Sequence, residues 1–240
     1  MHAAIVTGVS RGLGAALAAG LLERDFKVLG IGRTSKLTGP NYEFVGFDLA
    51  DAAHADEALS SALVAVEQAK PASVCLINNA AVAGPVGTVG RVSAAAVASS
   101  LAVNLVAVVT LANLFCRVFT DPAMRRRIIN VSSGAAQTAL PGESVYCVAK
   151  AGMEMLTRAL AEEQREPTFR AITIRPGVID TDMQSFARSQ SPDILPSVEL
   201  FKGFHRDGRL VPPDVVAGKI IDKLVMAEVE HGRTYTYQEL

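Results

Sequence analysis

The sequence predicts a doubly wound α/β fold, in which helices cover both faces of a parallel β-sheet. Short runs of β-branched and apolar residues alternate along the chain with longer helical stretches, which is the pattern of successive βαβ units. Several of the expected strands are almost continuously apolar, as strands are when both faces of their sheet are covered. No linker or internal repeat interrupts the 240 residues, so we expect one domain over residues 1–240.

About seven strands and five long helices are expected, in alternation. The strands are predicted at residues 3–7, 27–31, 43–47, 73–78, 127–132, 170–175 and, less regularly, 234–237. Helices are predicted near residues 13–24, 53–68, 97–119, 144–166 and 213–229. The connection at about residues 183–211 mixes aromatic and aliphatic residues with Pro, Ser and Gly. Long connections of this kind often line binding sites, so we expect a substrate lid there.

Composition and charge argue against several classes of partner. The formal net charge is −1, which predicts neither a nucleic-acid partner nor an anionic membrane surface. The one dense basic run, residues 125–127, is expected in a solvated turn. The apolar stretch 97–119 is interrupted by polar residues and falls short of the ~20 apolar residues that span a bilayer. We therefore expect a buried helix there and no membrane partner.

Cysteine and histidine usage indicates neither disulfides nor a metal site. Cys75, Cys116 and Cys147 are far apart and form no C-x-x-C pair, as expected for reduced thiols in a cytoplasmic protein. The four histidines share no ligand spacing, so no metal is expected.

A glycine-rich segment follows the first predicted strand and leads directly into an Ala-rich helix. Gly8, Gly12 and Gly14 lie in the segment from Thr7 to Gly14. Glycines allow a sharp strand-to-helix turn and bring the backbone close to a pyrophosphate, which the helix N-terminus stabilises. The segment therefore predicts a dinucleotide site, although many α/β proteins need tight turns without binding a nucleotide.

The end of the second predicted strand indicates which dinucleotide binds. NAD enzymes usually place a carboxylate there to bind the ribose hydroxyl groups, whereas this strand is followed by Arg33. Arg33 and Arg11, which lies in the glycine-rich segment, are expected to flank a ribose 2′-phosphate, because a guanidinium group matches phosphate in charge and shape. NADP(H) is therefore the expected cofactor; the alternative is that both are ordinary surface arginines.

Tyr146 and Lys150 lie four residues apart in a predicted helix, so both project from one face. A phenol titrates near ~10, and we expect the nearby ammonium group and an oxidised nicotinamide to lower the Tyr146 pKa. Tyr146 can then act as the acid or base on a carbonyl or alcohol oxygen. Ser133 ends the strand that precedes this helix, where its hydroxyl could hold the same oxygen; a turn or helix cap is the alternative role.

Together these motifs resemble the short-chain dehydrogenase/reductase family, with a Rossmann-type fold, over nearly the whole chain. Asn78-Asn79-Ala80-Ala81 resembles the family's N-N-A-G motif, with alanine in place of its glycine. The family's serine stands 13 positions before its tyrosine, which selects Ser133 over Ser132. The resemblance implies the catalytic residues Ser133, Tyr146, Lys150 and Asn104, the last holding a water molecule against the lysine. It implies cofactor contacts from Gly8, Ser10, Arg11, Gly12, Leu13, Gly14, Arg33, Asp48, Leu49, Asn79, Ala80, Tyr146, Lys150, Pro176, Gly177, Val178, Thr181 and Met183.

The segment from Pro176 to Gln184 resembles a narrower group, the NADPH-dependent sepiapterin reductases and the related benzil reductases, through its D-T-D-M-Q sequence. This resemblance implies reduction of a small aromatic or vicinal dicarbonyl compound, and an apolar lid suits such a substrate. Sepiapterin reductases hold the pterin with an acidic residue near the C-terminus, for which Glu239 is the nearest candidate.

Other activities and an assembly state are also considered. A broader alcohol dehydrogenase or 3-oxoacyl reductase is the alternative enzyme. A non-catalytic NADP-binding sensor is a further alternative, but Ser133, Tyr146 and Lys150 are all present. Helices like those at 97–119 and 144–166 commonly pair between subunits in this family, so we expect a homodimer, or a tetramer built from it.

Overall fold

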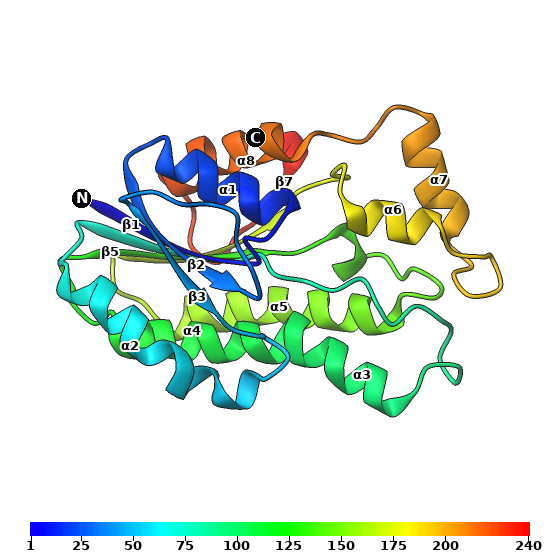
Figure 1. Ribbon diagram of the computed structural model, residues 1–240, viewed down its shortest axis with the longest axis horizontal. Coiled ribbons are helices and arrows are strands. Elements are labelled where there is room, and N and C mark those ends of the chain that lie inside the picture. Colours follow the sequence, from blue (N-terminus) through cyan, green and yellow to red (C-terminus); the bar gives the residue numbers. More distant parts are fainter.

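The computed structural model describes all 240 residues as a seven-stranded parallel sheet with helices on both faces (Figure 1). The strand order is β3-β2-β1-β4-β5-β6-β7, so the predicted doubly wound fold is confirmed. The strands are β1 (His2–Thr7), β2 (Phe26–Gly32), β3 (Tyr42–Gly46), β4 (Ser73–Asn78), β5 (Arg125–Val131), β6 (Phe169–Arg175) and β7 (Thr234–Thr236). The order reverses between β1 and β4, and in such sheets ligands bind at the carboxyl ends of the strands beside this switch point.

Two helical layers sandwich the sheet (Figure 1). One face is covered by α1 (Gly12–Leu22) and α8 (Pro213–Ile220), and the other by α2 (Ala55–Gln68), α4 (Ala107–Val118) and α5 (Ser144–Glu163). Alternate residues of β1 enter different cores: Ile5 packs in the core beneath α2 and α4, and Val6 packs in the core beneath α1 and α8. The two cores bury 22 and 21 residues, which explains why the central strands are apolar on both sides.

The long apolar helix differs from its prediction. It runs over Ala94–Val118 as α3 (Ala94–Leu101), a π-helical turn (Ala102–Val106) and α4, and by length and composition it could cross a membrane. Only 28% of its apolar window is buried. One face packs in the core through Leu111 and Phe115, whereas Val106 and Val109 stay largely exposed. The prediction of a buried helix is therefore correct for one face only.

The basic run at residues 125–127 forms the start of β5, so the prediction of a solvated turn is wrong. Arg126 is 5% exposed and donates a hydrogen bond to the Phe119 carbonyl oxygen at 3.1 Å. Arg127 donates to three carbonyl groups that follow α8, including Val225 O at 2.8 Å. Arginine can be buried in this way because its stem is apolar and its N–H groups can be satisfied by backbone carbonyls. This end of the sheet lies opposite the carboxyl edge.

Candidate active site

The glycine-rich segment forms the turn from β1 into α1. Gly8 and Gly12 have φ values of 76° and 58°, in the left-handed region that favours glycine. A Cβ atom at Gly8 would lie 2.8 Å from the Ala80 Cα, and one at Gly14 would collide with the Gly8 carbonyl oxygen. Only glycine at these two positions lets the turn pack against its neighbours, so the predicted loop geometry is present.

The end of β4 fixes this turn in place. The Thr7 hydroxyl accepts hydrogen bonds from the backbone N–H groups of Asn79 at 2.9 Å and Ala80 at 3.0 Å. The Asn79 amide donates to the Thr7 carbonyl oxygen at 2.9 Å. Asn79 and Ala80 therefore stabilise the loop.

The first turn of α1 is suited to a pyrophosphate group. Its N-cap residue, Arg11, makes no side-chain capping bond, so the first N–H groups of the helix have no acceptor from the cap. With the positive end of the helix dipole, such groups form an anion site. The protein's own residues therefore fit a dinucleotide here.

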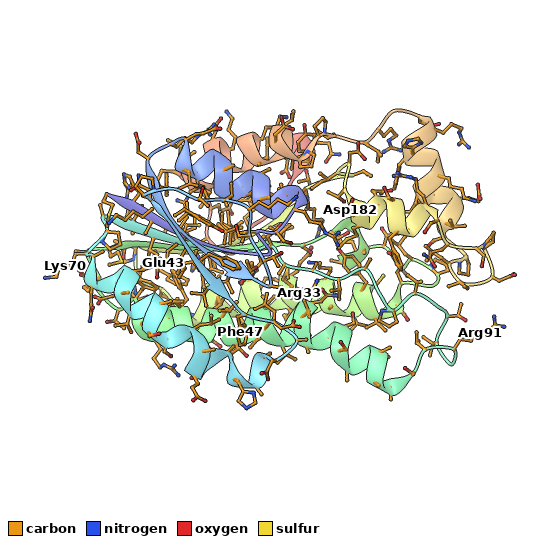
Figure 2. The ribbon with its side chains drawn as sticks, in the orientation of Figure 1. Arg33, Glu43, Phe47, Lys70, Arg91 and Asp182 are labelled. Carbon is orange, nitrogen blue, oxygen red and sulfur yellow. The ribbon has the colours of Figure 1, made fainter.

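The two arginines predicted to flank a 2′-phosphate are placed differently. Arg33 follows β2 at the carboxyl edge, exposed and without an ion-pair partner (Figure 2). Arg11 instead donates a hydrogen bond to Asp182 at 2.7 Å, in an exposed ion pair that joins the glycine-rich loop to α6 (Asp182–Arg188). Of these two arginines, Arg33 is thus the one whose guanidinium group makes no ion pair.

Asp48 and Leu49, two of the predicted cofactor contacts, lie beyond the end of β3. The Asp48 carboxylate accepts a hydrogen bond from the Ala50 N–H group at 3.0 Å, which stabilises the local turn, and Leu49 is buried. The structure therefore gives both residues local roles that do not depend on a nucleotide.

Three predicted catalytic side chains meet at the carboxyl edge of the sheet. Tyr146 and Lys150 lie on α5, and the Lys150 Nζ is 5.5 Å from the centroid of the Tyr146 ring. Lys150 is 1% exposed and donates a hydrogen bond to the Val131 carbonyl oxygen at 2.7 Å. Ser133 follows β5, and its Oγ accepts from the Ala135 N–H group at 3.2 Å as a local cap while also interacting with Tyr146.

The protein's own groups raise the Tyr146 pKa, contrary to the sequence-based expectation. Burial is the main cause, the Glu143 carboxylate adds to it, and the hydrogen bond with Ser133 opposes it. Burial also lowers the pKa of Lys150 to about 8. The expectation considered the charges of Lys150 and of an oxidised nicotinamide but overlooked desolvation, which disfavours the charged forms of both Tyr146 and Lys150. Within the protein alone, Tyr146 is therefore held in its proton-bearing form, the form that can act as an acid.

Asn104 lies in the π-helical turn and is fully buried. Its side-chain oxygen accepts from the Val82 N–H group at 2.8 Å, and its amide donates to the Val82 carbonyl oxygen at 3.0 Å. The side chain thus anchors the loop after β4 to the helix. The structure gives it no hydrogen bond to Lys150.

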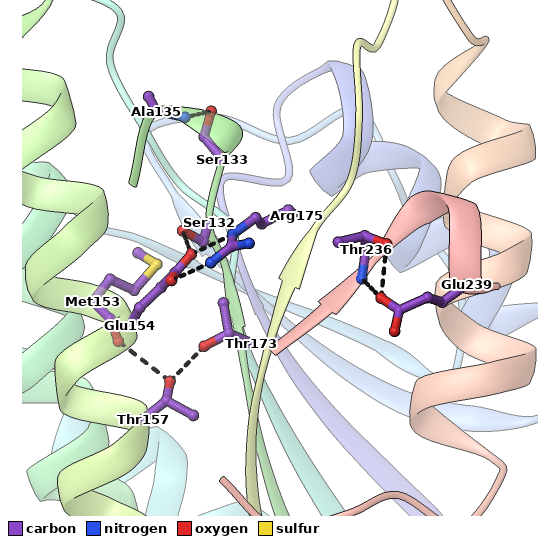
Figure 3. Close-up of polar contacts among 10 residues, drawn as sticks. All are labelled: Ser132, Ser133, Ala135, Met153, Glu154, Thr157, Thr173, Arg175, Thr236 and Glu239. Carbon is purple, nitrogen blue, oxygen red and sulfur yellow. Dashed lines mark hydrogen bonds and ion pairs between the residues drawn. The ribbon is translucent and has the colours of Figure 1, made fainter. Parts of the chain in front are cut away.

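A buried ion pair behind the catalytic group was not predicted. Arg175 donates two hydrogen bonds to Glu154, at 2.8 and 2.6 Å, and the Ser132 hydroxyl donates to the same carboxylate at 2.8 Å (Figure 3). The two charged side chains are 14% and 11% exposed. This Ser132–Glu154–Arg175 cluster joins β5, α5 and β6 next to Ser133 and Pro176. No motif spacing identifies it, because the three residues come from separate elements.

The turn after β6 faces the C-terminal segment. Gly177 has a φ of 76°, and a Cβ there would lie 3.4 Å from Tyr237. Thr181 packs beside Gly12, since a Cβ at that glycine would be 3.3 Å from the Thr181 methyl group. Pro176, Gly177, Val178, Thr181 and Met183 thus follow the carboxyl end of β6 and continue into α6.

Glu239, the candidate pterin ligand, is already engaged. One carboxylate oxygen accepts from the backbone N–H of Thr236 at 2.6 Å and from its hydroxyl at 2.7 Å (Figure 3), and the other accepts from Arg233 at 2.9 Å. The bond from the Thr236 N–H group is part of a capping box at the C-terminus, so the structure gives Glu239 a local structural role.

The predicted lid contains α6 and α7 (Val198–Arg206), which extend beyond the carboxyl edge (Figure 1). Leu195 and Val198 pack with Ala187 in a small core of their own, to which Phe201 adds. Part of the lid's apolar content is therefore internal packing, whereas Ile194 and Leu200 stay exposed.

Comparison with known proteins agrees with this geometry. The family model described as short chain dehydrogenase matches residues 2–192. The chain is 32% identical over 247 residues to benzil reductase ((S)-benzoin forming) of Bacillus subtilis (strain 168), covering 100% of this chain and 99% of that protein. It is 32% identical over 240 residues to sepiapterin reductase of Mus musculus, covering 92% and 90%.

A solved structure gives the same result for the fold. The crystal structure of the KRED1-Pglu enzyme superposes with a TM-score of 0.84 at 28% identity, covering 98% of this chain and 100% of that one. The resemblance predicted from the motifs is thus confirmed by independent comparisons. The chain belongs to the short-chain dehydrogenase family, as an oxidoreductase that reduces carbonyl groups with a nicotinamide cofactor.

Proposed function

We propose that this enzyme uses NADPH to reduce one carbonyl group of a small aromatic or vicinal dicarbonyl compound. The observation that carries the proposal is the grouping of Ser133, Tyr146 and Lys150 at the carboxyl edge, between the glycine-rich loop and the lid. The relatives named for benzil and sepiapterin reduction support the substrate class.

The preference for NADPH rests on Arg33. This exposed guanidinium group has no ion-pair partner and lies at the end of β2, where NAD enzymes usually place a carboxylate. A 2′-phosphate offers this guanidinium group a charged acceptor, which it can bind through two parallel hydrogen bonds. Arg11 contributes less to the preference for NADPH, because its guanidinium group is already in an ion pair with Asp182.

The chemistry assigned to the side chains is proton transfer and orientation. A nicotinamide cofactor, when bound at this edge, would supply the hydride that the carbonyl carbon accepts. The Ser133 hydroxyl holds the carbonyl oxygen, and Tyr146, held in its protonated form, donates the proton that converts this oxygen to a hydroxyl group. Lys150, fixed by the Val131 carbonyl, lies beside the ring and stabilises the phenolate that remains.

The test is NADPH oxidation by the purified protein with benzil, sepiapterin, a simple aldehyde and a 3-oxoacyl thioester. Turnover of benzil or sepiapterin faster than of the other two, and faster with NADPH than with NADH, is expected. Preferred turnover of the thioester would identify a 3-oxoacyl reductase instead. Tight NADPH binding without any turnover would indicate a sensor.

We further propose a cytoplasmic homodimer that has no membrane or nucleic-acid partner. Val106 and Val109 near the start of α4, and Val148 and Met155 on α5, are 43–60% exposed large apolar residues on two adjacent helices. A second copy of the same pair would bury both patches by two-fold symmetry. The near-neutral charge and three free thiols are in keeping with this proposal.

A further inference from the structure

Glu143 occupies the position immediately before α5, three residues ahead of Tyr146 and seven ahead of Lys150. Residues at this spacing share one face of a helix. The face that carries the catalytic tyrosine and lysine therefore begins with a carboxyl group, to which neither the motifs nor the proposed chemistry assigns a role.

The Glu143 side chain is largely buried, and its carboxylate, whose oxygens are not fully enclosed, has no partner within the protein. Glu143 is 7% exposed, makes no side-chain capping bond to α5, and has no ion pair. Burial alone raises its pKa, to about 7, with no hydrogen bond or nearby cation to offset the effect. Glu154, on the same helix and similarly buried, has three hydrogen bonds. Buried carboxylates are normally paired in this way, so Glu143 is the exception.

The segment that carries Glu143 contacts the lid. The Gly142 carbonyl oxygen accepts from the Gly87 N–H group at 2.8 Å, and the Pro141 carbonyl oxygen accepts from the Ser197 N–H group at 3.3 Å. A Cβ at Gly142 would lie 2.9 Å from the Leu195 and Pro196 side chains. Glu143 is thus located where α5, the loop after β4 and the lid meet, which is where a substrate has to lie to reach Tyr146.

Electrostatics link the two side chains. The charge of Glu143 raises the pKa of Tyr146, so an uncompensated carboxylate disfavours the phenolate that is left after proton donation. A cationic group on the substrate would pair with the carboxylate and remove this penalty during the reaction. A neutral substrate would leave the penalty in place.

We propose that Glu143 binds a protonated amine of the substrate, and that the natural substrate class is an aromatic ketone with an amino group close to the reacting carbonyl. The inference rests on the proposed carbonyl reduction at Tyr146 and specifies its substrate. No covalent step involves Glu143: it orients the substrate through a charge-assisted hydrogen bond.

Two ketones of nearly equal shape test the proposal: α-aminoacetophenone in its protonated form and propiophenone, in which a methyl group replaces the ammonium group. The ratio of their kcat/KM values is measured in the wild type, in Glu143→Gln and in Glu163→Gln, an exposed control on the same helix. The ratio is expected to fall at least about tenfold in Glu143→Gln and to stay unchanged in Glu163→Gln. The ammonium group activates the carbonyl in every variant equally, so only the change in ratio is diagnostic.

An unchanged ratio in Glu143→Gln, with benzil reduced normally by the wild type, would overturn the inference and leave the proposed function standing. If the wild type reduces no ketone at all, the inference and the proposed function are both contradicted. If Glu143→Gln does not fold, the inference is tested by inhibition of benzil reduction in the wild type. Phenethylamine is expected to inhibit at a concentration at least about tenfold lower than phenethyl alcohol. Equal inhibition by the two compounds would overturn the inference.

Discussion

Arg33 and Arg11 have equivalent predicted roles, yet the structure separates them, because Asp182 binds Arg11 and no carboxylate binds Arg33. We predict that Arg33→Ala raises KM for NADPH about 10- to 100-fold, because a charge-assisted contact with the 2′-phosphate is lost. KM for NADH is expected to change by less than twofold (about 0.4 kcal/mol or less). Arg11→Ala is the matched control, with a smaller effect on NADPH. Steady-state kinetics with both cofactors measure this; equal changes for NADPH and NADH in Arg33→Ala would refute the 2′-phosphate role.

Glu143 also predicts a pH dependence of stability. Its pKa is about 7 in the folded protein and near 4.5 when unfolded, so the folded state binds more protons between these values and its stability falls as pH rises through this window. We predict that Glu143→Gln is more stable than the wild type at pH 8, by up to about 3 kcal/mol, and gains less at pH 5. Thermal unfolding at the two pH values measures this; an equal gain at both would show that burial of the charge is not the cause.

At the scale of elements, the Ser132–Glu154–Arg175 cluster joins the residue after β5, the middle of α5 and the last residue of β6. Removing one charge leaves the other buried and unpaired, which costs about 3–5 kcal/mol, whereas replacing both with apolar residues often costs little. We therefore predict that Glu154→Leu lowers Tm strongly and that adding Arg175→Met restores much of it.

Catalysis in the double variant distinguishes positioning from stability. If the cluster positions Ser133 and the turn at Pro176, the restored protein keeps a kcat at least about tenfold below wild type, as expected for displaced catalytic groups, while KM for NADPH changes less. Full recovery of kcat together with Tm would mean that the cluster serves stability alone.

An element could be predicted from the sequence where the pattern that identifies it lies in one continuous segment of the chain. Strands and helices were predictable because burial on both sheet faces leaves apolar runs in the local sequence, and Tyr146 with Lys150 because a helix fixes their spacing. The start of β5 was missed, since the burial of Arg126 depends on the Phe119 carbonyl oxygen, which only the folded chain brings near. The same holds for Glu154 and Arg175, whose pairing is a tertiary contact.

At the scale of the molecule, the exposed apolar residues of α4 and α5 predict self-association. We expect Met155→Lys to convert the dimer to a monomer, because a charge would be buried at the centre of the interface. Met226→Lys is the matched control: Met155 and Met226 are 55% and 57% exposed, but Met155 lies on α5 and Met226 follows α8, and these two helices cover opposite faces of the sheet (Figure 1). Sedimentation equilibrium distinguishes the states; a dimer that survives Met155→Lys would place the interface elsewhere.

The whole account depends on Tyr146 as the proton donor to a carbonyl oxygen. The most direct test compares benzil reduction by wild type and Tyr146→Phe, with NADPH binding followed separately in both. The account predicts that Tyr146→Phe binds NADPH normally and loses about 10²- to 10⁴-fold in kcat, the usual contribution of a positioned acid. A Tyr146→Phe enzyme that binds NADPH and reduces benzil at the wild-type rate would contradict it.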